Sequence, residues 1–566
     1  MQGRILLAVF LSFLVLYVYQ ALLVPPPSPS PITQESATNP AVTVGEQTAI
    51  PDVQSQSVPL ASPGVTTIDQ IMPTPIIADN ELKEIVVESN VFRAVFTNRG
   101  AELLSWQLKD HLDDVGQPVE LVPRSLPPEE PWPLSLAFED ENLTRFAHEA
   151  LYRVNTTNLQ LDDRTDSLNF DYENSEGLRI SKTLEFDPAT DPYGFRLTVQ
   201  ASTGGVPLVP TMKWGPALGG VESQVSGIAF REGPRGVIYG RVLENNVIQE
   251  PDVVRVTASQ AFGQSVYQGQ MAFLGVDNHY FIAAALPGMQ EASIQYRPVP
   301  LPPQDPDGDP RDLMAFNLTV PGGITSLPMF LGPKDFDILQ ASNPNLVRAI
   351  EFGWFSWLVV PLHKSLTWVH SYVGNYGWSI IILTFIINVI IFPLRHKSVV
   401  SMRKMQKIQP QVKAIQERYK NMKMTEKQKM NQEIMSLYRD RGVNPASGCL
   451  PMLLTMPILF AFYRLLSMSI EIRGAPFIAW ITDLSAHDPM YVTPIVMGAS
   501  MVLQQRMTPS QADPMQQKMM MLMPIVFTAL FLYAPAGLVL YWLTSNAIAI
   551  GQQAVTNRFV PLPNVT

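Results

Sequence analysis

Residues 376–394 read YGWSIIILTFIINVIIFPL, and this apolar stretch sets the class of fold. As a helix these residues would be about 28 Å long, close to the thickness of the hydrocarbon layer of a membrane. Residues 395–441 follow at once and carry thirteen Lys and Arg against four Asp and Glu. Because basic loops stay in the cytoplasm, we predict a membrane helix whose carboxyl end faces the cytoplasm.

Further apolar stretches predict a multi-pass protein of the inner membrane. They are residues 5–24, 450–469, 490–505, 519–533 and 537–550. We expect an uncleaved anchor at residues 1–24, because prolines follow it instead of the small residues of a cleavage site.

Basic residues near the later stretches fix the expected topology. Arg506 and Lys518 bracket an inside loop, and Arg558 follows the last stretch. Both termini are therefore expected in the cytoplasm. The prediction is six spans, with a five-span core at 376–556 and a short tail at 557–566.

The segment between anchor and core is expected on the periplasmic side. Residues 25–80 are rich in Pro, Ser and Thr, which favours a flexible tether. From 81 to 342 apolar and polar residues alternate, for example at Phe195, Leu197 and Val199, as in half-buried antiparallel strands. The chain has a single cysteine and so no internal disulfide. We predict a large all-β sandwich held together by its own core.

Residues 343–375 are expected to form an amphipathic helix along the outer membrane interface. They mix Trp354 and Trp357 with charged residues such as Arg348 and Lys364. The headgroup layer favours tryptophan, so this stretch is predicted to lie on the membrane and not to cross it.

The basic stretch predicts a cytoplasmic helical hairpin at 396–442. Its apolar residues are three and four apart, which indicates two antiparallel amphipathic helices. Methionine is flexible and accepts varied apolar partners, so we assign this face to substrate recruitment. The alternatives are a plain hairpin core and a basic surface attracted to anionic lipid or to RNA, without recognition of a nucleic-acid sequence. The recruitment candidates are Met405, Ile408, Val412, Ile415, Tyr419, Met430 and Ile434.

Motifs of the common enzyme classes do not occur in the sequence. There is no His-Glu-x-x-His pair, no Gly-x-Ser-x-Gly elbow and no Gly-x-x-x-x-Gly-Lys loop for phosphate. The apolar stretches also contain no Asp for an intramembrane aspartyl protease. We expect no catalytic residue, no cofactor and no metal site.

Polar side chains inside the apolar stretches are the candidate functional residues. Thr384 and Asn388 are four residues apart and share one face of a helix. Polar groups are costly in lipid, so they predict either a wet groove or hydrogen bonds that fasten the bundle. The groove candidates are Thr384, Asn388, Arg464, Tyr541, Trp542, Ser545 and Asn546.

Several separate motifs, in order, resemble those of one known family. They are YGWSIIILT at 376–384, VNP at 443–445, GCLP at 448–451, DLSA at 483–486, DPMQQK at 513–518 and GLVLYW at 537–542. Together they resemble the YidC family of bacterial membrane protein insertases in its Gram-negative six-span form. The β-rich part is similar in position and size to the super-sandwich of that family, which resembles sugar mutarotases but has no catalytic activity.

The resemblance implies a function and a mechanism. Members of the family insert and fold nascent membrane proteins through a hydrophilic groove that is open to the cytoplasm and to lipid. They need no nucleotide hydrolysis, because substrate hydrophobicity drives the step with help from the membrane potential. Implied partners are nascent membrane proteins, the Sec translocon, the ribosome and anionic lipids. Thr384 and Trp542 would contact the substrate.

The sequence departs from the family at one position. Family members usually carry a groove arginine on the second span, and the matching residue here is Asn388. Arg464 is a candidate substitute, but it lies roughly 21 Å from the cytoplasmic end of its span, against roughly 9 Å for Asn388. Whether Arg464 faces the groove or the outer headgroups stays open.

Two other classes of function compete with an insertase. A transporter or channel would need paired charges near the midplane or inverted repeats, and the sequence has neither. A membrane-anchored periplasmic assembly chaperone would leave the Met-rich basic hairpin without a role.

Overall fold

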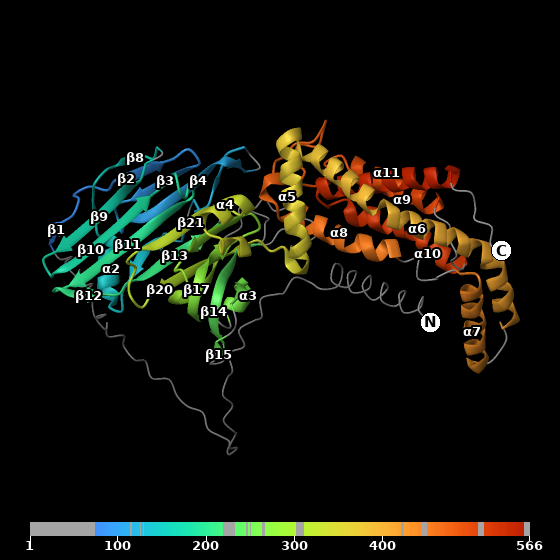
Figure 1. Cartoon of the computed structure of the whole chain (residues 1–566). Coiled ribbons are helices and arrows are strands. Elements are labelled where there is room, and N and C mark those ends of the chain that lie inside the picture. The colour runs from blue at the N-terminus through green and yellow to red at the C-terminus, as the bar shows by residue number, and fades with distance from the viewer. Residues whose placement is uncertain are drawn as a thin grey trace, which may run out of the picture. The chain divides into compact units, whose positions relative to one another are not determined.

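A computed structural model of the chain describes residues 74–559 with several gaps (Figure 1). The gaps are 114–115, 125, 128–129, 163, 219–232, 245–246, 249–250, 263–265, 302–310, 420–423, 443–449 and 508–513. The predicted anchor at 1–24 and most of the tether at 25–80 lie outside the described residues. The described residues belong to one compact unit that begins at Pro73.

The β-rich part contains two sheets. The larger sheet has 16 strands with the central order β1-β9-β10-β11-β21-β18-β17-β19-β20-β13-β6. Its strands are β1 (Pro75–Ile77), β6 (Ser135–Ala137), β7 (Arg153–Val154), β9 (Asp166–Asn174), β10 (Leu178–Phe186), β11 (Gly194–Thr203), β12 (Val206–Leu208), β13 (Thr211–Ala217), β14 (Arg235–Glu244), β15 (Val247–Ile248), β16 (Asp252–Val256), β17 (Val266–Asp277), β18 (Phe281–Ala285), β19 (Gln290–Leu301), β20 (Arg311–Thr319) and β21 (Leu327–Pro333).

The smaller sheet has five strands in the order β5-β4-β3-β2-β8. They are β2 (Glu84–Glu88), β3 (Phe92–Thr97), β4 (Glu102–Leu112), β5 (Pro118–Glu120) and β8 (Asn158–Gln160). Short helices lie between and after the strands, namely α2 (Glu141–Glu149), α3 (Ala258–Ala261) and α4 (Phe336–Ser342).

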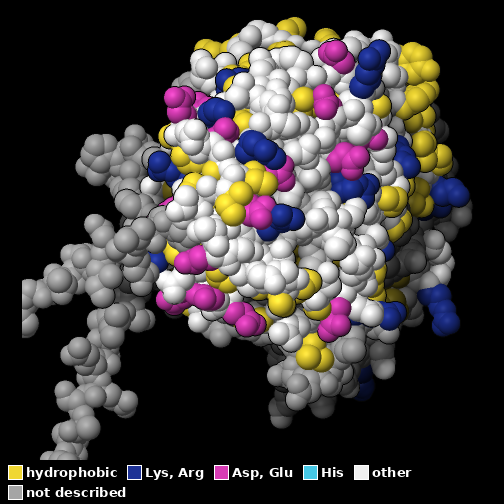
Figure 2. All heavy atoms as spheres, turned by 90° about the vertical axis from the view of Figure 1, so that its left-hand side faces the viewer, with side chains coloured by type: hydrophobic (Ala, Val, Ile, Leu, Met, Phe, Trp, Pro, Cys, Tyr) yellow, Lys and Arg dark blue, Asp and Glu magenta, His cyan; other side chains and the backbone are white. Residues whose placement is uncertain are grey.

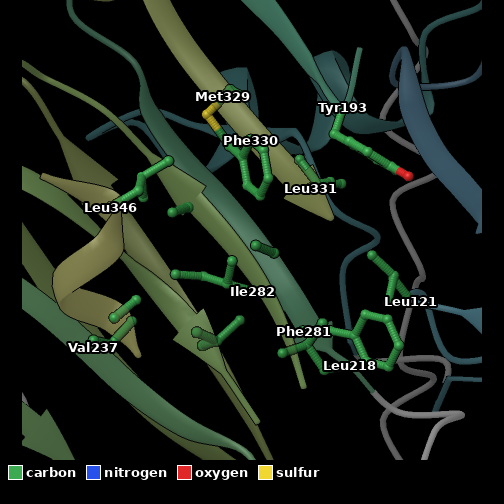
Figure 3. Packing of buried hydrophobic residues seen from close by; sticks show 14 of the residues in the cluster. Leu121, Tyr193, Leu218, Val237, Phe281, Ile282, Met329, Phe330, Leu331 and Leu346 are labelled. Atoms are coloured by element: carbon green, nitrogen blue, oxygen red, sulfur yellow. The ribbon is translucent and has the colours of Figure 1, made fainter. Parts of the chain in front are cut away.

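The predicted β-sandwich is confirmed, and the alternation that predicted it has a clear physical basis. Phe195, Leu197 and Val199 of β11 are all buried, while the residues between them face outward. The buried faces of both sheets form one hydrophobic cluster, part of which is shown in Figure 3. Trp106 of β4 donates its indole N–H to the carbonyl of Leu331 in β21 over 3.1 Å, which joins the two sheets across the core. On the side where β1 lies, acidic and basic side chains are interspersed (Figure 2).

Helices make up the second half of the chain. They are α5 (Ser356–Val373), α6 (Tyr376–Arg418), α7 (Met424–Asp440), α8 (Leu450–Met468), α9 (Val492–Met507), α10 (Pro514–Phe531) and α11 (Ala536–Phe559). Short 3-10 turns are η1 (Leu346–Ala349), η2 (Gly353–Phe355) and η4 (Ile470–Ile472).

Within the stretch 343–375 the structure has the turns η1 and η2 followed by the helix α5, and a place along the membrane interface stays a prediction. In α5, Val359, Leu362 and Leu366 are buried against neighbouring elements, whereas Trp357 and Trp368 are exposed. An apolar side directed inward and a tryptophan-bearing side directed outward are typical of a helix that lies at a membrane interface.

The length of α6 differs from the prediction. It does not end near Leu394 but continues to Arg418, so the predicted span and the first helix of the hairpin are one helix of 43 residues. Only α6, among the residues that the structure describes, is both long and apolar enough to cross a membrane by itself. The count of six spans therefore stays a prediction. The last helix is also longer than expected, since α11 continues to Phe559.

Candidate functional site

A stripe of polar side chains runs along one face of α6. Thr384 donates to the carbonyl of Ile380 over 2.6 Å, and the Asn388 amide donates to the carbonyl of Thr384 over 2.8 Å. Arg395 then donates from Nη1 to the side-chain oxygen of Asn388 over 3.0 Å. Spacings of four and seven residues bring these side chains to the same face of a helix. Thr384 and Asn388 are buried, so the stripe faces the other helices.

Arg395 is the residue that the sequence analysis missed at this site. It was counted only among the basic residues that set the topology, because the span was expected to end at Leu394. In the structure its guanidinium lies half-buried beside Asn388. Within the described residues, no carboxylate forms a salt bridge with Arg395. Among the residues that the structure describes, this cation therefore has no acidic partner.

Two neighbouring aromatic residues of α11, Tyr541 and Trp542, pack against different helices. Tyr541 stacks on Phe462 of α8, with ring centroids 4.3 Å apart, and is buried. Trp542 packs against α10, with its ring 5.4 Å from that of Phe527 and 5.0 Å from that of Phe531. Tyr541 therefore packs on α8, whereas Trp542 fills the contact between α10 and α11.

Asn546 fastens two helices together. Its amide donates to the hydroxyl of Ser500 on α9 over 2.9 Å, and Ser500 in turn donates to the carbonyl of Met497. This is the structural alternative that the sequence analysis left open for the polar residues of the last span. Ser545, its neighbour, is half-buried, and its place in a groove stays a prediction.

Arg464 lies close to η2. A side-chain carbon built on Gly353 of η2 would lie 3.6 Å from Nε of Arg464. Gly353 belongs to the segment between the β-rich part and α5, so Arg464 is at the end of α8 that meets α5. A role of Arg464 in the groove stays a prediction.

The predicted recruitment face is largely covered in the structure. Met405, Ile408, Val412 and Ile415 are buried, and the first two pack against Tyr438 of α7. The remaining candidates Tyr419, Met430 and Ile434 are half-buried. An ion pair of 2.8 Å joins Arg418 at the end of α6 to Glu433 of α7. The Met-rich face therefore forms the core of the hairpin here, and its use in recruitment stays a prediction.

Comparisons with known proteins agree along most of the chain. The family model described as YidC periplasmic domain matches residues 84–365, and the one described as 60Kd inner membrane protein matches residues 368–562. The membrane protein insertase YidC of Geobacter metallireducens is 37% identical over 99% of both chains. That of Syntrophus aciditrophicus is 34% identical over 99% of this chain and 100% of its own.

Solved structures give weaker similarities. A crystal structure of an active YidC insertase covers 86% of this chain and 95% of its own, with 18% identity and a TM-score of 0.35. A putative aldose 1-epimerase from Escherichia coli K12 covers 44% of this chain and 98% of its own, with 10% identity and a TM-score of 0.26.

Proposed function

The chain belongs to the YidC family of membrane protein insertases, and from this membership we propose how its helices receive a substrate. Its function is the insertion of membrane proteins into the inner membrane, and residues 84–365 are its periplasmic domain. The proposal concerns the polar face of α6, where Arg395 takes the place of the cation that is absent at Asn388.

The observation that carries the proposal is the bond from Arg395 to Asn388. A cation with no acidic partner is costly in a partly buried site, and an incoming carboxylate offsets that cost. The attraction is stronger than in water, because the effective dielectric constant among the helices is lower. Asn388 contributes by holding the guanidinium against α6, since it accepts one of its N–H groups. An acidic segment of a nascent membrane protein is therefore the expected ligand.

The rest of the mechanism follows from the apolar surroundings. Once a polar segment sits on the α6 face, the apolar segment of the substrate moves into lipid along the helices. The transfer of apolar surface from water supplies the free energy, so no nucleotide, cofactor or covalent step is required. We place α6, α8, α9, α10 and α11 across the membrane together with the anchor at 1–24, and both termini in the cytoplasm. The Sec translocon, the ribosome and anionic lipids are proposed partners. Family membership does not favour a transporter or channel.

A charge swap tests this proposal. In inverted membrane vesicles, R395Q is expected to reduce the insertion of a substrate with an acidic translocated tail by about tenfold, equivalent to about 1.4 kcal/mol. A substrate whose tail carries Asn and Gln instead should be affected much less. R395E should prefer a substrate with a Lys-bearing tail. Equal insertion of the acidic and neutral substrates by the wild-type protein and by R395Q would contradict the assignment.

Photo-crosslinking provides an independent measurement. A photoreactive residue at Thr384 or Asn388 is expected to capture a ribosome-stalled nascent chain. The matched control is Ile390 on the same helix, which is 72% exposed and therefore faces away from the other helices. Substitution at Trp542 should give weaker capture, because its ring is packed between the aromatic residues of α10.

A further inference from the structure

The turn between β17 and β18 in the periplasmic domain is buried, although turns usually lie at the surface. Asp277, Asn278, His279, Tyr280 and Phe281 are each at most 5% exposed. The side chain of Asn278 accepts hydrogen bonds from the N–H groups of Tyr280 and Phe281, at 3.0 and 2.8 Å. Hydrogen bonds within the turn therefore fix its backbone conformation. Its burial means that another part of the chain packs on it.

Salt bridges fix the start of this turn to the sheet behind it. The carboxylate of Asp277, which is fully buried, accepts from Arg235 and from Lys334, each over 3.0 Å. A buried carboxylate with two cationic partners resists displacement, because loss of either partner leaves an uncompensated charge. The turn is thus a rigid projection of the periplasmic domain.

The end of α8 covers the turn. Nε2 of His279 donates to the carbonyl of Ser467 over 2.5 Å, and a carbonyl can only accept, so Nε2 carries the proton. Ser467 belongs to the last turn of α8, where carbonyls have no partner within the helix. A histidine from another part of the chain therefore caps α8. The guanidinium of Arg473 lies over the rings of Tyr280 and Phe281, at 5.7 and 5.6 Å.

The segment that follows α8 lies across the outer ends of two other core helices. We call residues 469–491 the outer loop. The side chain of Asn375, which caps α6, donates to the carbonyls of Pro476 and Phe477 in this loop, at 3.1 and 3.2 Å. At the start of α11, the N–H of Gly537 donates to the carbonyl of Leu484 over 2.9 Å. The outer loop therefore connects the ends of α6, α8 and α11.

Gly377 shows how closely the outer loop approaches α6. A side-chain carbon at Gly377 would lie 2.0 Å from the ring of Phe477, so only glycine allows this contact. Ser379 lies one helical turn after the start of α6 and is completely buried. The polar stripe of α6 begins one turn further along, at Thr384. Closure of the outer ends therefore depends on the position of the outer loop.

We propose that the β17–β18 turn holds the outer loop in place and thereby closes the outer ends of the core helices, with His279 and Arg473 as its positioning residues. The periplasmic domain then stabilises the closed arrangement of the core helices. Contacts of the turn with the end of α8 at Ser467 and with Arg473 in the loop fix where the outer loop begins, and the rest of the loop reaches α6 and α11. This inference concerns closure in the protein without substrate, so it does not depend on charge capture by Arg395.

Cysteine labelling from the outer side tests the proposal. Cys449, the single cysteine, is replaced by serine, and S379C is introduced into the full chain. In spheroplasts, an impermeant maleimide should label S379C slowly. H279A should raise the labelling rate by about fivefold, as expected from the loss of one hydrogen bond of ordinary net strength. H279Q should restore slow labelling, because the glutamine amide can donate to the same carbonyl.

Two further variants complete the experiment. R473Q removes the cation over Tyr280 and Phe281 and is expected to raise the labelling rate of S379C as well. It replaces H279A in the experiment if H279A does not accumulate in the membrane. H148A is the matched control, because His148 pairs with Glu102 within the periplasmic domain. Rapid labelling of S379C in the parent protein would overturn the proposal. So would unchanged labelling in folded H279A and R473Q.

Discussion

Arg395 donates a hydrogen bond of 3.0 Å to the side-chain oxygen of Asn388, which lies seven residues earlier on the same helix. The two residues therefore act as one unit, in which Asn388 positions the guanidinium and Arg395 supplies the charge. Their energetic contributions should not be additive, because residues in direct contact couple.

A double-mutant cycle measures this coupling. N388A should lower insertion of an acidic-tailed substrate by a few-fold, and R395Q by about tenfold. The double variant N388A/R395Q should be no worse than R395Q alone, since Asn388 has no role once the guanidinium is gone. Insertion rates in inverted vesicles give the four values. Losses that multiply would show that Asn388 contacts the substrate independently.

Gly498 is predicted to be intolerant of any side chain. A side-chain carbon there would lie 1.9 Å from Oγ1 of Thr528 on α10. G498A should therefore destabilise the contact between α9 and α10 by about 1–3 kcal/mol. Thermal unfolding of the full chain in detergent measures the change. G551A on α11 is the control, because no atom lies within 4 Å of the added carbon, and it should leave the melting temperature unchanged or slightly raised.

The ion pair of His363 with Glu471 predicts a pH dependence of stability. Burial opposes protonation, but the hydrogen bond of 2.8 Å that His363 donates to Glu471 and the charges of Glu471, Asp337 and Asp335 outweigh it and raise the pKa of His363. A raised folded-state pKa means that this stabilisation is complete below the unfolded pKa of about 6.5 and is lost as pH rises through the folded value.

Melting temperatures at pH 6 and pH 9 check this sign. The wild-type protein should lose more stability between these values than H363Q or E471Q, and each kcal/mol corresponds to about 2 °C or less in a chain longer than about 250 residues. Both variants lack the titrating pair, so their difference between pH 6 and pH 9 should be smaller and alike. A larger difference in H363Q would contradict the prediction.

The packing of α7 on α6 in the hairpin should depend more on Met405 than on Met435. Met405 is 5% exposed and packs with Ile408 and Tyr438, whereas Met435 is 58% exposed. M405A should loosen the packing of α7 on α6 by about 2 kcal/mol or more, while M435A should change it by less than about 0.5 kcal/mol. Limited proteolysis within residues 424–440 reports the loosening. If M435A lowers insertion while the hairpin stays intact, the exposed face of α7 recruits substrate.

Strand alternation predicted the periplasmic domain because one face of each strand is buried. At Phe195, Leu197 and Val199 the sequence pattern and the burial coincide. The stripe on α6 was half predicted, since Thr384 and Asn388 share a face at a spacing of four. Arg395 was missed because helices were assumed to end where apolar residues end. Continuing the helical period by seven residues would have found it.

Other features depend on how helices are rotated about their axes, which sequence patterns do not specify. Asn546 was equally suited to a groove and to a hydrogen bond with another helix, and only its position opposite Ser500 decides between them. The surroundings of Arg464 likewise depend on Gly353, which is distant in sequence. The cap of His279 on α8 joins residues 188 positions apart, which no local pattern could indicate.

The 43 residues of α6 correspond to a rod about 64 Å long, of which the second half extends past the apolar stretch. Pro393 lies inside this rod, two residues before Arg395, and proline removes a backbone hydrogen bond and allows a helix to bend. The point at which α6 can bend therefore lies next to Arg395. A bend at Pro393 is therefore expected to change the position of Arg395 relative to Thr384 and Asn388, because the proline lies between them and Arg395 on one helix.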